Sequence, residues 1–210
     1  MDRWMFGISL ATDFNSVGMM HEKSLSAKIG GQLYFLITPN WWISAGIQYS
    51  NKKYNTSAEY YSPGNGYWEK RTNGVLPDNI FGTCSVFDIP VMVTYRFFNK
   101  EFISLTASAG VSNYLMQDEI YEFEFNQDNP GAATGWQTAE NTTAPFSFGN
   151  IYLGIEWQTS QRTFLVIEPF LQVPFKEVGW GNVKIYSTGL QVKIKYQIGN
   201  PGSTVKNLYK

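Results

Sequence analysis

Glu156 and Glu168 come nearest to a catalytic pair in this chain, because two facing carboxylates can hydrolyse glycosidic bonds. Both lie on one parity of two consecutive apolar segments that are predicted to be adjacent strands. Adjacent strands need opposing groups in any case, so packing within a polar face is the simpler interpretation. The single histidine, His21, and the single cysteine, Cys84, provide no Ser-His-Asp set, no cysteine-rich zinc site and no intrachain disulfide. We expect a non-enzymatic protein without a cofactor or a metal.

The two glutamates belong to a larger set of charged residues on the same parity of the predicted strands. The set holds both signs: Lys28, Lys52, Asp88, Arg96, Glu156, Glu168, Lys193 and Lys195. Opposite charges can satisfy one another in an interior, so we expect a charge network in which Lys193 and Lys195 pair with Glu156 and Glu168. Two interpretations stay open: a gated or proton-linked conduit, and a plug of salt bridges in a barrel too narrow to conduct. The plug is favoured.

Eight segments of alternating apolar and polar residues must position these charges. The predicted strands span about 4–13, 27–37, 41–53, 85–97, 102–115, 148–158, 163–173 and 183–198. Each has one apolar face and one face of small or charged residues, because side chains alternate across a strand. The connections alternate strictly between long and short, which is typical of barrels with short periplasmic turns and long outer loops. Pro90 and Pro169 lack a ladder donor, so we expect a bulge or an irregular strand near each.

Composition decides which face points outward. Charged residues make up 16% of the 210 residues, against roughly 25% in soluble proteins, which indicates that much of the surface does not meet water. The apolar faces hold more side chains than eight strands can enclose. Aromatic residues gather at both ends of those faces, as at membrane interfaces. They are Trp4, Phe35, Trp41, Tyr95, Phe97, Trp157 and Tyr196 at the turn side, and Phe14, Tyr49, Phe87 and Tyr186 at the loop side.

We therefore predict an all-β, eight-stranded antiparallel up-and-down transmembrane β-barrel over residues 1–198, in the bacterial outer membrane with both termini periplasmic. Residues 199–210 are predicted to form an irregular periplasmic tail. The alternative is a soluble lipocalin-like ligand-binding barrel, which alternates with its apolar face inward. The net charge of −1 gives no electrostatic basis for nucleic-acid binding. No signal peptide precedes the first strand, so we expect a mature or excised domain.

Two long loops carry candidate binding residues. The first, about 54–83, contains Tyr60, Tyr61, Tyr67 and Trp68. Exposed aromatic rings can stack on sugars or anchor a partner protein, whereas in the favoured interpretation the rings of a β-hairpin pack on one another. The second loop opens with the acidic stretch QDEIYEFEFNQDNP. Its spacing is not that of an EF-hand calcium site, so we interpret it as a strand continuing outward with a solvated edge.

The C-terminal stretch EPFLQVPFKEVGWGNVKIYSTGLQVKIKY resembles the small eight-stranded outer-membrane β-barrel proteins of the Bacteroidota, the PorT-like group. In that group a strand ending in Pro-Phe-Leu leads through a glycine-rich loop to the closing strand. The closing strand also looks like the insertion signal that the barrel assembly machinery reads, here carried by Ser187, Gly189, Val192, Ile194 and Tyr196.

The resemblance implies a membrane anchor or structural barrel. Its expected partners are outer-membrane lipid, the barrel assembly machinery, and a surface or periplasmic protein or a glycan bound by the loops. A second function stays open, in which the chain is the C-terminal barrel of an envelope-spanning anti-sigma regulator.

Overall fold

The computed structural model describes residues 3–18 and 23–198, so His21 and the predicted tail at 199–210 lie outside the described residues. The strands are β1 (Trp4–Val17), β2 (Ser24–Leu36), β3 (Trp41–Thr56), β4 (Asn79–Lys100), β5 (Ile103–Glu124), β6 (Gly135–Thr138), β7 (Thr142–Gln158), β8 (Thr163–Pro174) and β9 (Ile185–Ile198). A 3-10 turn, η1 (Ala58–Tyr60), and a short helix, α1 (Tyr67–Thr72), lie between β3 and β4. Among the described residues, none forms a helix long and apolar enough to cross a membrane.

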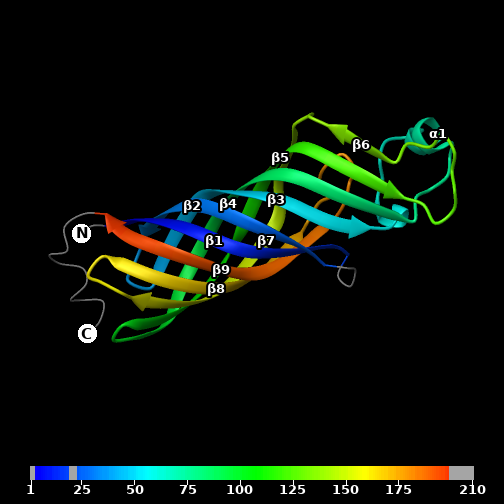
Figure 1. The fold of residues 1–210 in the computed structure, drawn as a ribbon. Helices are drawn as coiled ribbons and strands as arrows, with labels where there is room; N and C mark the ends of the chain where they lie inside the picture. The colour runs from blue at the N-terminus through cyan, green and yellow to red at the C-terminus, as the bar shows by residue number, and fades with distance from the viewer. Residues whose placement is uncertain (1–2, 19–22, 199–210) are drawn as a thin grey trace.

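Eight long strands close into one antiparallel barrel, and the short β6 pairs only with the loop-side part of β5 (Figure 1). The first and last strands, β1 and β9, pair continuously from Trp4↔Ile198 to Val17↔Ile185. Within the described ranges the long strands therefore form a continuous ring. That closure is what a hydrocarbon environment demands, because unpaired backbone groups find no water there.

All eight predicted strands are present, and the alternation of short and long connections is confirmed. The predicted boundaries were too narrow at the loop side, where β3, β4 and β5 continue well beyond the apolar band. β4 and β5 each have 22 residues, whereas β8 has 12. The barrel consequently rises on one side into a sheet that includes β6, with α1 at its loop-side end (Figure 1).

Alternation along each strand turns apolar side chains outward and polar ones inward. Leu10 on β1 is 63% exposed, whereas the inward Lys52 on β3 is fully buried. The apolar faces are thus the exterior, which is the opposite of a lipocalin-like barrel. The soluble ligand-binding alternative is therefore wrong, since the interior that such a barrel would offer to a ligand is here polar and charged.

Aromatic pairs mark both ends of the exposed apolar band. At the turn side Trp41 packs on Tyr95 with ring centres 4.6 Å apart, and Trp4 packs on a β2 ring. At the loop side Tyr49 packs on Phe87 at 5.2 Å. Cross-strand aromatic pairs stabilise neighbouring strands in addition to their burial. The two predicted bands of aromatic residues, one at each end of the apolar band, are thus present.

The two strand prolines interrupt the ladder without shifting it. Pairing of β3 with β4 lapses between Ala45↔Val91 and Gln48↔Asp88, on either side of Pro90, and resumes in the same register. Pairing of β7 with β8 lapses in the same way beside Pro169. The expected local irregularity is therefore present at both prolines. The β-bulges lie elsewhere, because the register shifts fall at Cys84/Ser85, Arg96/Phe98 and Ser112/Tyr114.

Candidate functional site

The inward charges form a set of linked polar groups, among which Lys52 is fully buried. Its Nζ donates to Asp13 Oδ2 at 2.7 Å, to Asn15 Oδ1 at 2.8 Å and to Ser187 Oγ at 2.8 Å. An ammonium group has three donors, so this lysine is fully satisfied. The contact joins β3, β1 and β9 across the interior.

A second group of polar contacts surrounds Gln172 on β8. Its Nε2 donates to Asp88 Oδ2 at 3.0 Å and to Asn150 Oδ1 at 2.9 Å, and its Oε1 accepts from the hydroxyl of Tyr114. Lys28 Nζ lies 3.9 Å from Asp88 Oδ2 and 4.8 Å from the centre of an aromatic ring on β8. These contacts connect β8 with β2, β4, β5 and β7.

The third group lies toward the turn side. Glu156 accepts from Arg96 Nη2 at 2.9 Å and from Lys195 Nζ, while Lys193 Nζ lies 2.6 Å from Glu168 Oε2. The structure thus places Lys193 and Lys195 against the two glutamates named from the sequence. Glu156 and Glu168 each face a cation. This agrees with the interpretation that they are paired charges within a polar face, and not with a catalytic dyad of free carboxylates.

Bulky rings fill the remaining interior. Trp42 lies under both Arg96 and Lys195, at 4.9 and 5.0 Å from its ring centre. The cavity beside Lys193 and Glu168 has a volume of about 10 Å³, which is close to the minimum for a single water molecule. A cavity of this size cannot hold a hydrated ion or a solute.

The buried charges also balance in sign. Among the described residues the buried cations are Lys28, Lys52, Arg96, Lys193 and Lys195, and the buried carboxylates are Asp13, Asp88, Glu119, Glu156 and Glu168. Five of each sign give the interior no net charge with which to select an ion. The arrangement therefore fits a plug of salt bridges better than a conduit.

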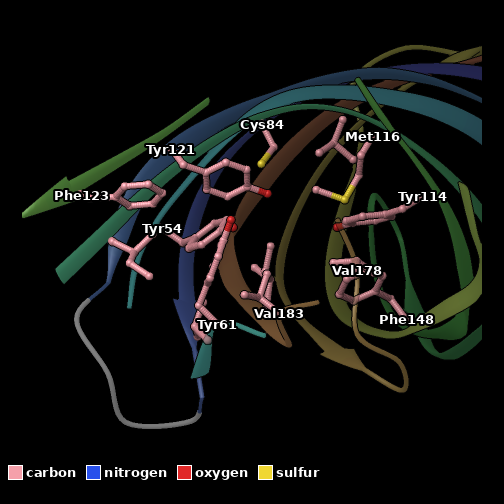
Figure 2. Close-up of a cluster of buried hydrophobic side chains, with 14 of the residues drawn as sticks. Tyr54, Tyr61, Cys84, Tyr114, Met116, Tyr121, Phe123, Phe148, Val178 and Val183 are labelled. Carbon is pink, nitrogen blue, oxygen red and sulfur yellow. The ribbon is translucent and has the colours of Figure 1, made fainter. Parts of the chain in front are cut away.

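An apolar cap closes the loop-side mouth. Figure 2 shows the rings of Tyr54, Tyr61 and Tyr121 turned into the same interior as Val178 and Val183 from the β8–β9 loop. Val178 and Val183 bridge to each other and are almost fully buried. The β8–β9 loop thus folds into the mouth and fills it.

Glu119 anchors this cap, and sequence reasoning placed it on a solvated edge. It is fully buried; its carboxylate accepts from the hydroxyl of Tyr121 and, at 2.9 Å, from the backbone N–H of Trp180 in the β8–β9 loop. The cause is a β-bulge at Asp118, whose φ is 42° and which has no partner between Gln117 and Glu119. The extra residue reverses the parity of β5 and turns Glu119 inward.

The aromatic residues of the first long loop mostly pack on one another. Tyr61 and Tyr67 are buried, with Tyr61 5.7 Å from the Trp68 ring and 5.2 Å from that of Tyr121. Their predicted role at an exposed binding surface is therefore wrong, although the alternative of mutually packed rings holds. The segment is not a β-hairpin but contains η1 and α1. Burial raises the pKa of Tyr61 and of Tyr67, so both hydroxyls stay protonated at neutral pH.

Tyr60 remains exposed and Trp68 is half-buried. The segment named as an assembly signal lies on β9, where Val192, Ile194 and Tyr196 point outward and Gly189 points inward. Sequence reasoning missed Asp13, which shares the parity of its inward neighbours but stood at the predicted end of the first strand.

No protein-family model matches the sequence, and no curated protein sequence matches it. Solved structures do match. Neisserial surface protein A has a TM-score of 0.55 at 9% identity, with 93% of this chain and 97% of that chain covered. Ail, the attachment invasion locus protein of Yersinia pestis, has a TM-score of 0.47 at 11% identity over 93% and 100%. The outer-membrane protease OmpT from Escherichia coli has 0.43 at 9% over 94% and 97%. The first likeness shows that the fold is that of a small outer-membrane β-barrel.

The Lys52 contact generates a stability prediction. Lys52→Met leaves Asp13 buried without its cation, and breaking a buried ion pair in this way costs about 3–5 kcal/mol. Adding Asp13→Asn to Lys52→Met should recover much of that loss. The measurement is urea-induced unfolding of the protein in lipid vesicles, followed by tryptophan fluorescence.

The matched control is Lys70→Met, which removes an exposed lysine on α1, outside the barrel interior. Its free energy of unfolding should stay within about 0.5 kcal/mol of the wild type. Equal destabilisation by the two lysine substitutions would show that the buried contact contributes nothing specific.

Proposed function

We propose that the chain is a non-enzymatic outer-membrane barrel that serves as a membrane anchor, with its loop side bound to a surface protein or a glycan. The height of the apolar band carries this proposal. Trp4 and Phe14 bound the exposed apolar face of β1, and ten residue steps correspond to roughly 33 Å along a strand. At the usual tilt of about 40° this becomes about 25 Å along the barrel axis, which equals the apolar band of outer-membrane barrels.

The closed interior supports an anchor over a channel. A cavity of about 10 Å³ beside Lys193 and Glu168 and the balance of the buried charges favour a filled interior over a conduit. Function must then be located on the surfaces that the barrel presents. On the proposed orientation the loop side faces the exterior of the cell and the short turns face the periplasm, as in other barrels of this class.

The loop-side surface supports a binding role. Tyr60, Val75 and Leu76, in the connection between β3 and β4, are 42%, 47% and 56% exposed. Below them Tyr61 and Tyr67 are packed into the cap, so the connection is held in a fixed shape. Exposed apolar groups on a rigid support favour binding, because little conformational entropy is lost when a partner docks.

The orientation is tested by labelling single cysteines in intact cells. Native Cys84 is fully buried and should give little background. Lys70→Cys, on the exposed face of α1, should react with a membrane-impermeant maleimide in intact cells. Lys100→Cys, at the short-turn end, should react only after the outer membrane is permeabilised.

Labelling of both positions in intact cells, or of neither after permeabilisation, would contradict the proposed placement. Labelling of Lys100→Cys alone in intact cells would indicate the opposite orientation of the barrel. Heat-modifiable gel migration of the same samples should accompany the labelling, because a closed barrel stays folded in detergent until it is heated.

A planar-bilayer recording tests the anchor against a channel. The purified protein should give no discrete conductance steps, since the buried charged side chains and the loop-side cap each close the lumen. A porin inserted into the same bilayer provides the positive control. Reproducible unitary steps from this protein would contradict the plug and favour a conduit.

The proposed assembly signal on β9 is tested by substitution. Gly189→Val should strongly reduce insertion, because a Cβ at Gly189 would collide with the backbone carbonyl of Thr12 on β1. Tyr196→Ala should reduce it as well, by removing an exposed ring at the proposed interface. Heat-modifiable migration of the protein recovered from the outer membranes of expressing cells provides the readout, with Tyr60→Ala as the loop control. Wild-type insertion by both β9 variants would refute the assignment.

A further inference from the structure

The exterior of the barrel has a groove over β9, β1 and β2. It has a volume of about 420 Å³ and is lined by Ile8, Leu10, Ile29, Gly31, Val192 and Ile194, together with Ser9 and Gly30. Gly31 causes it. This residue lies on the outward face of β2, opposite Ile8 on β1 and Ile47 on β3, and contributes no side chain.

Three exposed lysines lie on the same side of the barrel, at its loop-side margin. Lys53 is on the outer face of β3, and its backbone N–H donates to Ser26 on β2 at 2.9 Å. Lys23 directly precedes β2. Lys184 directly precedes β9, and its carbonyl accepts from the N–H of Gly18 beside the end of β1. Among the described residues none of the three ammonium groups forms an ion pair.

The opposite side of the barrel has the opposite charge. Beyond the apolar band, β5 presents Asp118, Glu122 and Glu124 to solvent. An anionic headgroup is therefore attracted to the β9–β1–β2–β3 side and repelled from the β5 side. This charge complementarity distinguishes the groove from the rest of the apolar exterior.

The spacing between groove and lysines matches a lipid. Ile29 and Lys23 are six positions apart, which is roughly 20 Å along a strand and about 15 Å along the axis after tilt. Half the thickness of a hydrocarbon core is also about 15 Å. A lipid with its phosphate at the lysines thus has an acyl chain long enough to reach the groove.

We propose that this side of the barrel binds a net-anionic lipid with a phosphate-bearing headgroup, held by Lys23, Lys53 and Lys184 and with one acyl chain in the groove at Gly31. The site rests on the proposed membrane placement, since only then does the groove face acyl chains. The lysines provide headgroup selectivity and the groove provides chain binding. The two contributions are separable by substitution.

The test is native mass spectrometry of the detergent-solubilised protein with equimolar dioleoylphosphatidylglycerol and dioleoylphosphatidylcholine. The wild type should retain the anionic lipid preferentially. Lys23→Gln/Lys53→Gln/Lys184→Gln should lower that preference about tenfold or more, since each basic residue near an anionic surface contributes about fivefold. The control Lys70→Gln/Lys100→Gln/Lys176→Gln removes the same charge from exposed positions elsewhere and should keep the preference.

Gly31→Leu tests the groove. A Cβ at Gly31 makes only ordinary contacts, 3.6 Å or more from its neighbours, so the variant should fold and retain less of both lipids. Equal loss of preference in the two triple variants would show a general charge effect and overturn the site. Absence of preference in a wild type that shows heat-modifiable migration and correct labelling would overturn the lipid site alone and leave the membrane anchor intact.

Discussion

Pairing of β1 with β9 is the constraint on which the rest of the barrel depends, because it fixes the register of a closed sheet. A shift of one residue would exchange the two faces of β9. Ile194 would then enter the lumen, and Lys193 and Lys195 would face the exterior. The contacts of these lysines with Glu168 and Glu156 exist in the observed register only. Separating a buried ion pair costs about 3–5 kcal/mol, because it leaves a charge uncompensated, so the interior charges disfavour the shifted register.

The same closure explains why the interior is polar. Eight strands enclose little volume, and the apolar side chains of this chain are already committed to the exterior. Inward positions are consequently filled by groups that satisfy one another, such as Lys52 with Asp13 and Gln172 with Asp88. Rings such as Trp42 occupy the space between them. A lumen packed in this way leaves little open space, which favours the loops and the outer wall as the places of recognition.

The period of two along each strand was enough to predict the strands, their order and the inward positions of the principal charges. The same period did not predict the direction of side chains where a β-bulge changes it. The bulge at Asp118 reverses parity, so Glu119 was predicted to be solvated although it holds the cap. A positive-φ aspartate has no sequence signature that separates it from its acidic neighbours. The buried Tyr61 and Tyr67 were equally hidden, because they pack on rings that are distant in the sequence: Tyr121 on β5, Trp136 on β6 and Trp180 in the β8–β9 loop.

Unequal strand length gives the two sides of the barrel different surroundings. On the β3–β4–β5 side the strands continue far past the apolar band, and β5 ends in acidic residues that repel anionic groups. On the β9–β1–β2 side the strands end near the aromatic ring of Phe14, and the β1–β2 connection spans only 18–23. Headgroups can approach the barrel closely on this second side, where Lys23 and Lys184 are exposed. The unequal strand length that forms the loop-side sheet therefore also determines on which side lipid headgroups can reach charged side chains.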